Sequence, residues 1–188
     1  MKKGKLIVLS GPSGTGKTTL CRELVKRIPG LVFSISVTTR DKRPGEKDGY
    51  DYYFLAPAEF KRKIKAREFL EWAKVYNQFY GTLKKPITDN LAQGVSVLLD
   101  IDMQGALQVK DKFPQAVLIF ILPPSLAELH QRLIRRKRDS LATIARRMKQ
   151  IEEEMKYIPQ YDQVVINKDL AKTVKSLQAI IKNSRNSR

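Results

Sequence analysis

Short apolar runs alternate with longer segments of helical periodicity along most of this chain. The apolar runs predict buried strands at 5–10, 31–37, 95–100, 116–122 and 163–167. The segments between and after them predict helices at 19–28, 104–112, 125–136, 140–157 and 170–182. Strands that alternate with helices are typical of an α/β fold with a parallel core sheet flanked by helices.

The stretch 38–94 does not follow this alternation. It is rich in aromatic and charged residues, and two short runs within it, 51–55 and 69–75, predict strands of a separate mixed sheet. We therefore expect an insertion between the second and third core strands. A second, shorter irregular patch at 135–139 separates two of the predicted helices.

Length and composition limit the class of protein. The 188 residues, of which 42% are hydrophobic and 29% charged, are enough for one domain with a full core. No run approaches the ~20 apolar residues of a membrane span, and the first apolar run is too short for a signal peptide. The one cysteine, Cys21, cannot form an internal disulfide, which is compatible with a reducing compartment. These features predict a cytoplasmic protein with no membrane partner.

The formal net charge of +17 allows two interpretations. A basic chain can bind nucleic acid, or it can bind polyanionic nucleotides. The sequence has no zinc-finger spacing, no aromatic RNA-binding consensus and no heptad with a basic region. We therefore favour phosphate chemistry and expect no specific nucleic-acid partner.

The most informative segment lies between the first predicted strand and the first predicted helix. It fits the phosphate-binding pattern G-x-x-x-x-G-K-[ST] in full, with Gly11, Pro12, Ser13, Gly14, Thr15, Gly16, Lys17 and Thr18. In such a loop, successive backbone N–H groups and the helix N-terminus surround a phosphate. Lys17 can then reach the β- and γ-phosphates of a nucleotide, and the Thr18 hydroxyl can bind Mg²⁺.

Two further features indicate phosphate or metal chemistry. Asp100 ends an apolar strand, where a carboxylate can hold a Mg²⁺-bound water opposite the phosphate-binding loop. A strand-end aspartate can also serve only as a helix cap. Arg40 and Arg43 lie beside turn residues, and guanidinium groups bind phosphate in a bidentate manner. A solvated basic loop is the alternative interpretation of this arginine pair.

Several motifs together resemble the guanylate kinase family. They are Ser34–Arg40, Arg43–Glu46, Gly49 with Asp51-Tyr52, Phe69–Ala73, Tyr80–Thr82, Leu99–Gly105, Ile119–Ser125 and the phosphate-binding loop. The resemblance runs in order from about residue 4 to residue 182. Guanylate kinases transfer the γ-phosphoryl group of ATP to GMP or dGMP with Mg²⁺, giving ADP and GDP or dGDP. The resemblance implies a P-loop fold in three parts: a core (1–37, 95–131 and 148–188), a GMP-binding insertion (38–94) and a short lid (132–147).

The resemblance also implies roles for individual residues. The ATP site would comprise the phosphate-binding loop, Thr19 and Asn167, and Mg²⁺ would be held by Thr18 and Asp100. The GMP phosphate would be bound by Arg40, Arg43, Tyr52 and Tyr80, and the guanine base by Ser36, Glu71, Thr82 and Asp102. The groups that act on the transferred phosphoryl would be Lys17, Arg40, Arg132, Arg136 and Arg147.

The chemistry of guanine supports this choice of base-binding residues. Guanine presents N1–H and its 2-amino group side by side, so the single carboxylate of Glu71 can accept both hydrogen bonds. Adenine has an acceptor at N1 and lacks that amino group, which would leave a buried carboxylate unpaired at a high cost.

The chain departs from the family pattern at three places. The lid reads Arg135-Arg136-Lys137-Arg138 without the usual glycine, Asn167-Lys168-Asp169-Leu170 stands for Asn-Asp-Asp-Leu, and Asn77-Gln78-Phe79-Tyr80-Gly81 stands for Asn-Tyr-Tyr-Gly. Three other functions share some features: a phosphopeptide-binding guanylate-kinase-like module, a ribose-bisphosphate kinase and charge-driven nucleic-acid binding. The complete loop favours catalysis over a binding module, and Glu71 with Thr82 favours a purine acceptor.

Overall fold

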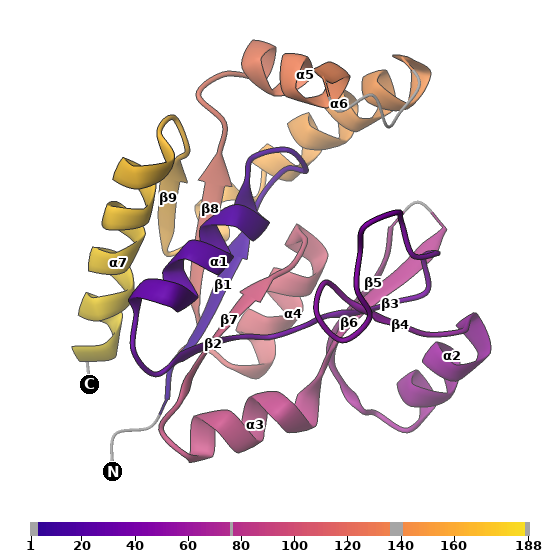
Figure 1. Ribbon diagram of the computed structural model, residues 1–188, viewed down its shortest axis with the longest axis vertical. Coiled ribbons are helices and arrows are strands. Elements are labelled where there is room, and N and C mark those ends of the chain that lie inside the picture. The colour runs from indigo at the N-terminus through magenta and orange to yellow at the C-terminus, as the bar shows by residue number, and fades with distance from the viewer. Residues whose placement is uncertain (1–3, 76, 136–140, 187–188) are drawn as a thin grey trace.

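A parallel sheet forms the centre of the computed structural model, which describes residues 4–75, 77–135 and 141–186. Within these residues the sheet has five strands in the order β2 (Leu31–Phe33), β7 (Ser96–Asp100), β1 (Leu6–Ser10), β8 (Val117–Leu122) and β9 (Gln163–Ile166) (Figure 1). Every neighbouring pair is parallel. The α/β class predicted from the sequence is therefore confirmed.

Helices cover both faces of this sheet, which explains why its strands are continuous apolar runs. On one face, α1 (Lys17–Arg27) and α7 (Leu170–Asn186) bury Leu20, Leu24 and Leu177 against Ile7 and Leu9. On the other face, α3 (Lys84–Ala92) and α4 (Met103–Lys112) bury Ile87, Ala106 and Val109 against alternate residues of the same strands. Both layers are visible in Figure 1.

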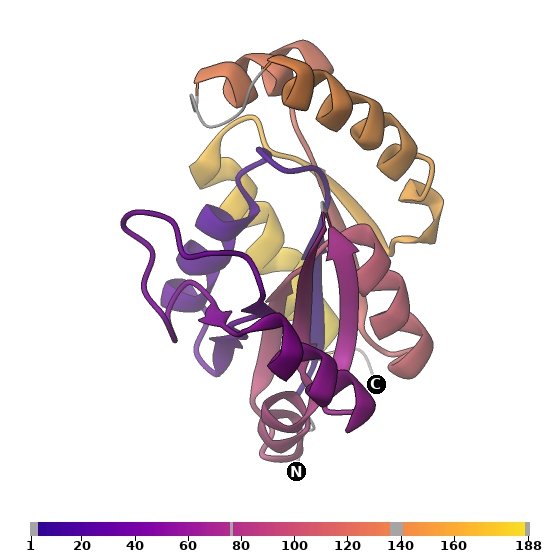
Figure 2. The ribbon, with the colours of Figure 1, turned by 90° about the vertical axis from the view of Figure 1, so that its right-hand side faces the viewer.

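A second sheet lies beside the core. Within the described residues this sheet has four strands, in the order β4 (Tyr53–Phe54), β3 (Val37–Thr38), β6 (Gln78–Leu83) and β5 (Phe69–Val75). α2 (Pro57–Lys65) covers one face, where Phe60 stacks between Phe69 and Phe79. In Figure 1 this unit lies to the right of the core sheet, and in Figure 2 it lies in front of the core.

One strand boundary differs from the sequence prediction. The run 31–37 was expected to form one strand, but it divides between the two sheets. The Ser34 N–H still donates to Leu98 O of the core at 3.0 Å, whereas Ser36 O accepts from the Tyr53 N–H of the second sheet at 2.9 Å. An apolar run of this length therefore leaves one sheet and enters another, and periodicity gives no sign of that change. The pattern also did not predict α2, β6 or α3.

The helices α5 (Leu126–Arg135) and α6 (Leu141–Met155) form a hairpin above the sheet in Figure 1. They share a hydrophobic cluster of their own, with Leu129, Leu133, Ile144 and Ile151 buried. Residues 136–140, and with them Arg136, lie outside the described residues. After a short 3₁₀ turn (Ile158–Gln160) the chain enters β9. Among the residues described, no helix has the length and apolar character needed to cross a membrane.

Candidate active site

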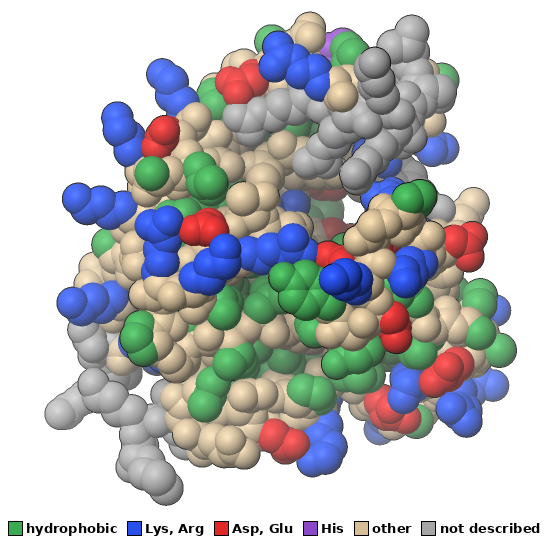
Figure 3. Space-filling model, in the orientation of Figure 1, with side chains coloured by type: hydrophobic (Ala, Val, Ile, Leu, Met, Phe, Trp, Pro, Cys, Tyr) green, Lys and Arg blue, Asp and Glu red, His purple; other side chains and the backbone are tan. Residues whose placement is uncertain are grey.

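The carboxyl ends of β1 and β7 bring the phosphate-binding loop and Asp100 to the same edge of the core sheet. A cavity of about 320 Å³ opens there, between that edge, the second sheet and α6 (Figure 3). Of the predicted site residues, those that line it are Gly11, Ser13, Gly14, Gly16, Lys17, Thr18, Thr19, Ser36, Tyr52, Glu71, Tyr80, Asp100, Asp102 and Arg147.

Close backbone packing fixes the shape of the phosphate-binding loop. Gly11 has φ +129°, and a Cβ there would collide with the carbonyl oxygen of Ile121 in β8. Thr15 is buried, and its hydroxyl donates to Pro12 O at 2.9 Å. The Asn167 side-chain amide donates to Thr15 O at 2.7 Å from the end of β9. Pro12, Thr15 and Asn167 thus support the loop from behind and do not line the cavity.

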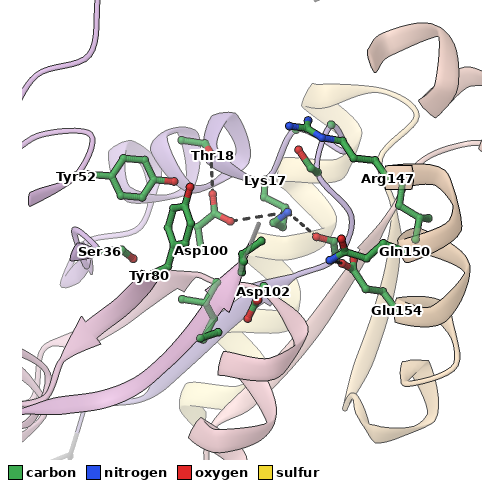
Figure 4. Close-up of a pocket in the computed structure, with 18 of the residues that line it drawn as sticks. Lys17, Thr18, Ser36, Tyr52, Tyr80, Asp100, Asp102, Arg147, Gln150 and Glu154 are labelled. Carbon is green, nitrogen blue, oxygen red and sulfur yellow. Dashed lines mark hydrogen bonds and ion pairs between the residues drawn. The ribbon is translucent and has the colours of Figure 1, made fainter. Parts of the chain in front are cut away.

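Lys17, Thr18 and Asp100 form a polar cluster at the start of α1 (Figure 4). The Lys17 Nζ donates to Gly11 O at 2.6 Å and to Pro12 O at 3.2 Å, and it lies 4.0 Å from Asp100 Oδ1. The Thr18 hydroxyl donates to Asp100 Oδ2 at 2.7 Å. The lysine therefore lies across the mouth of the loop, with its charge at the place where a phosphate would bind.

Glu71 is the most deeply buried acid of the cavity, with 3% of its surface exposed. Its Oε1 accepts from the Thr82 hydroxyl at 2.5 Å, and its Oε2 lies against Gly105, where a Cβ would collide with it. Burial raises the pKa of Glu71 to about 7, and the neighbouring Asp102 adds to this, while Thr82 and Lys112 oppose it. A carboxyl in this state accepts a proton or a hydrogen-bond donor readily.

Asp102 lies beside Glu71 at the N-terminus of α4. Its Oδ1 accepts from the Gly105 N–H at 2.8 Å, so it caps the helix as well as lining the cavity. Burial raises the pKa of Asp102, and the backbone hydrogen bond and Lys17 oppose that rise. Two partly desolvated acids thus face one part of the cavity, an arrangement that suits a ligand with adjacent N–H donors.

The predicted phosphate-binding arginines lie on the loop before β4, outside the cavity lining. Arg40 pairs with Glu46 at 2.7 Å, and its guanidinium lies 5.6 Å from the ring centre of Tyr52. The Arg43 backbone N–H donates to Glu46 Oε2 at 2.8 Å, and its side chain is exposed. Tyr52 packs edge-on against Tyr80. The structure therefore places Arg40 next to the two tyrosines and Arg43 farther out.

Comparison with known proteins decides the family. A model of the guanylate kinase family matches residues 3–184. The guanylate kinase of Caldanaerobacter subterraneus subsp. tengcongensis is 51% identical over 180 residues, which cover 96% of this chain and 87% of that protein. This chain belongs to the guanylate kinase family. The guanylate kinase of Carboxydothermus hydrogenoformans is 49% identical over 181 residues, covering 96% of this chain and 89% of that protein.

A solved guanylate kinase agrees with this assignment. The crystal structure of guanylate kinase from Anaplasma phagocytophilum matches with a TM-score of 0.84 at 35% identity, over 99% of this chain and 88% of that chain. The resemblance read from the motifs and the P-loop fold class are both confirmed. The chain is accordingly an enzyme, a nucleoside monophosphate kinase.

Sequence reasoning missed part of the cavity lining contributed by α6. Gln150, Ile151 and Glu154 line the cavity together with Arg147 (Figure 4). Burial raises the pKa of Glu154, whereas Lys17 opposes that rise. The spacing of these four residues places them on one helix face. That periodicity could have indicated a shared face, although not what the face contacts. Arg132 belongs to α5, and its side chain lies outside the described structure.

The raised pKa of Glu71 gives a testable dependence of stability on pH. The pKa is about 7 in the fold and about 4.3 in the unfolded chain, so the folded state binds the proton more tightly. This contribution to stability is full below pH 4.3 and is lost as pH rises through 7. Urea unfolding of the wild type and of Glu71→Gln at pH 5 and pH 8 tests this. We expect the free energy of unfolding of the wild type, relative to that of the variant, to fall by about 2–3 kcal/mol between pH 5 and pH 8.

A matched control is Glu152→Gln, at an exposed position of α6. Its difference from wild type should stay nearly constant over the same pH range. A Glu71→Gln difference that is equally constant would contradict the assignment of a raised pKa to Glu71.

Proposed function

We propose that this protein transfers the γ-phosphoryl group of ATP to GMP or dGMP, giving ADP and GDP or dGDP. The observation that carries this proposal is that one cavity holds both ends of such a reaction. The phosphate-binding loop with Lys17 lines one side, and the buried Glu71 and the partly buried Asp102 line another. A donor phosphate and an acceptor base could therefore occupy the same space.

On the donor side, the loop amides and Lys17 would bind the β- and γ-phosphates of ATP. Binding would draw the Lys17 ammonium from the Gly11 and Pro12 carbonyls to the phosphate oxygens. Asn167 would act by supporting Thr15 within the loop, which its hydrogen bond favours. The resemblance to guanylate kinases also implies that Asn167 contacts the adenine base of ATP.

Thr18 and Asp100 would hold Mg²⁺ together with the ATP phosphates. Both present hard oxygen ligands, and their side-chain oxygens lie 2.7 Å apart. Mg²⁺ usually binds through one or two carboxylates plus substrate phosphates, so this donor set fits. When bound, the ion neutralises charge on the β- and γ-phosphate oxygens.

On the acceptor side, Glu71 would accept hydrogen bonds from guanine N1–H and the 2-amino group, next to Asp102. Thr82 would orient the Glu71 carboxylate, and Ser36 would reach guanine O6 from the cavity lining. The GMP phosphate would be bound by Arg40, Arg43, Tyr52 and Tyr80. Burial raises the pKa of Tyr52 to about 12, which keeps its phenol protonated as a donor.

The transfer itself would need positioning and positive charge more than a strong base. Lys17 and Arg147 both line the cavity and would stabilise charge on the transferred phosphoryl. A lid at 132–147 would bring Arg132 and Arg136 to the same phosphoryl group. The GMP-binding insertion, residues 38–94, would move when GMP binds. Closing these parts would exclude water and so limit ATP hydrolysis. We also propose a cytoplasmic location, with which the buried free thiol of Cys21 is compatible.

A coupled assay of ADP formation tests the proposal, with ATP, Mg²⁺ and GMP, dGMP, AMP, CMP or UMP as acceptor. Turnover confined to GMP and dGMP is the expected result. Turnover that is equal with AMP would show that Glu71 and Asp102 do not select the base. Absence of turnover with every nucleotide would refute the proposed reaction.

A pair of variants at Thr18 tests the metal assignment. Thr18→Val keeps the shape of the side chain and removes its oxygen, whereas Thr18→Ser keeps the oxygen. We expect Thr18→Val to raise the Mg²⁺ concentration for half-maximal activity at least about tenfold, and Thr18→Ser to leave it within about twofold. Equal Mg²⁺ dependence in the two variants would remove Thr18 from the metal site.

A further inference from the structure

β5 lies at the edge of the second sheet, so one row of its backbone groups points away from β6. Helix α4 satisfies that row with side chains. The Gln108 amide oxygen accepts from the Trp72 N–H at 3.3 Å, and the Gln108 amide nitrogen donates to Trp72 O at 2.8 Å. Lys112 donates to the carbonyl oxygen of Leu70, two residues away on the same edge. A single glutamine thus pairs with both backbone groups of Trp72, much as a neighbouring strand would.

The same length of β5 carries Glu71. The strand register shifts between Phe69 and Glu71, so these two side chains lie on opposite faces of β5 although they are two residues apart. Phe69 stacks on Phe60, away from the cavity, whereas Glu71 lines the cavity and lies against Gly105. Gly105, Gln108 and Lys112 follow at helical spacing, so one face of α4 contacts Glu71, Trp72 and Leu70 in turn.

We propose that Gln108 is a positioning residue for guanine recognition, because its paired hydrogen bonds to Trp72 hold Glu71 in place relative to Asp102. This inference rests on the proposed function. Glu71 must meet two adjacent N–H donors at once, so its carboxylate has to be correct in both place and orientation. Loss of the two hydrogen bonds between Gln108 and Trp72 would let the edge of β5 shift. Displacements of about 1 Å at such sites can lower the rate about 10²-fold.

Gln108 can be separated from the charges that act on Glu71. The groups that face Glu71 are Thr82 from β6 and Asp102 and Lys112 from α4. Replacing Lys112 would remove a cation as well as a hydrogen bond, so its effect would be mixed. Gln108 is neutral, so its replacement by alanine would remove the two hydrogen bonds to Trp72 without adding or removing a charge.

The test compares two acceptors that differ only in one of the two groups that Glu71 would recognise. Inosine monophosphate (IMP) has N1–H but lacks the 2-amino group. In Gln108→Ala we expect kcat/KM for GMP to fall about tenfold, kcat/KM for IMP to change less than about threefold, and KM for ATP to stay constant. The ratio of GMP to IMP activity should therefore fall, which a general loss of folded protein would not produce.

Binding can be measured without turnover, because Trp72 is the only tryptophan of the chain. Its fluorescence during GMP and IMP titrations should show the same loss of discrimination. Gln108→Glu is the second variant. Its carboxylate can accept from the Trp72 N–H but repels Trp72 O, so we expect a loss at least as large as in Gln108→Ala. Asp111→Ala, at an exposed position of the same helix, is the control and should keep the wild-type ratio.

The outcomes separate this inference from the function on which it rests. Failure of the wild type to phosphorylate GMP refutes both. A wild type that phosphorylates GMP, with folded Gln108 variants that keep the wild-type ratio of GMP to IMP, refutes the positioning role alone. A reduced ratio in both Gln108 variants, with an unchanged ratio in Asp111→Ala, supports it.

Discussion

Replacing Lys17 by methionine is expected to lower kcat by about 10³-fold or more, while GMP still binds within about twofold of wild type. Methionine keeps much of the length of the side chain and removes its charge. The Lys17 ammonium lies against the Gly11 and Pro12 carbonyls at the mouth of the phosphate-binding loop, where the donor phosphates would bind. The proposed guanine-binding acids, Glu71 and Asp102, accept hydrogen bonds from Thr82 and from the Gly105 N–H, whereas Lys17 donates to the loop carbonyls. Steady-state kinetics and a Trp72 fluorescence titration with GMP measure the two effects separately.

Lys26→Met is the matched control, since Lys26 lies on the same helix but pairs at the surface with Glu23. It should retain wild-type turnover. If Lys17→Met keeps more than about a tenth of wild-type kcat, Lys17 does not stabilise the transferred phosphoryl group. A parallel loss of GMP binding would mean that the substitution disturbs the whole cavity.

The donor half of the site could be predicted because its signal is local. Eight successive residues define the phosphate-binding loop, and the strand before it and the helix after it follow from periodicity alone. The core strands were predictable for the same reason, since strands buried on both faces read as continuous apolar runs. Asp100 was recognisable because it ends such a run. Each of these inferences needs only neighbouring residues.

The acceptor half depends on contacts that the residue pattern does not contain. The alternation in 69–75 would place Phe69 and Glu71 on one face of a strand, but the irregularity between them places Phe69 beneath α2 and Glu71 in the cavity. The change of sheet within 31–37 is hidden for a similar reason. Glu71 was found through the resemblance to a family, because an acid in an edge strand otherwise suggests a surface residue. Glu154 was not found by either route, since its position depends on how α6 crosses the cavity.

Replacing Glu71 by glutamine is expected to lower kcat/KM for GMP by about 10²- to 10³-fold and to affect IMP much less. The amide of glutamine can accept one hydrogen bond, but its NH₂ group would face a guanine donor. The wild-type carboxylate must be ionised to accept from both donors, and its pKa is about 7 in the protein without nucleotide. GMP affinity of the wild type should therefore rise with pH up to about 7 and then level off.

The pH profile distinguishes Glu71 from the phosphate of GMP, which also titrates near pH 6. The phosphate is common to wild type and Glu71→Gln, so only the additional limb near pH 7 should disappear in the variant. Calorimetry in buffers of different ionisation enthalpy should show that GMP binding to the wild type releases a proton near pH 6.5, beyond any change in Glu71→Gln. Equal proton release in both proteins, or an unchanged preference for GMP over IMP, would show that another group recognises guanine. Because Asp102 also lies beside this position, it would be the next residue to replace.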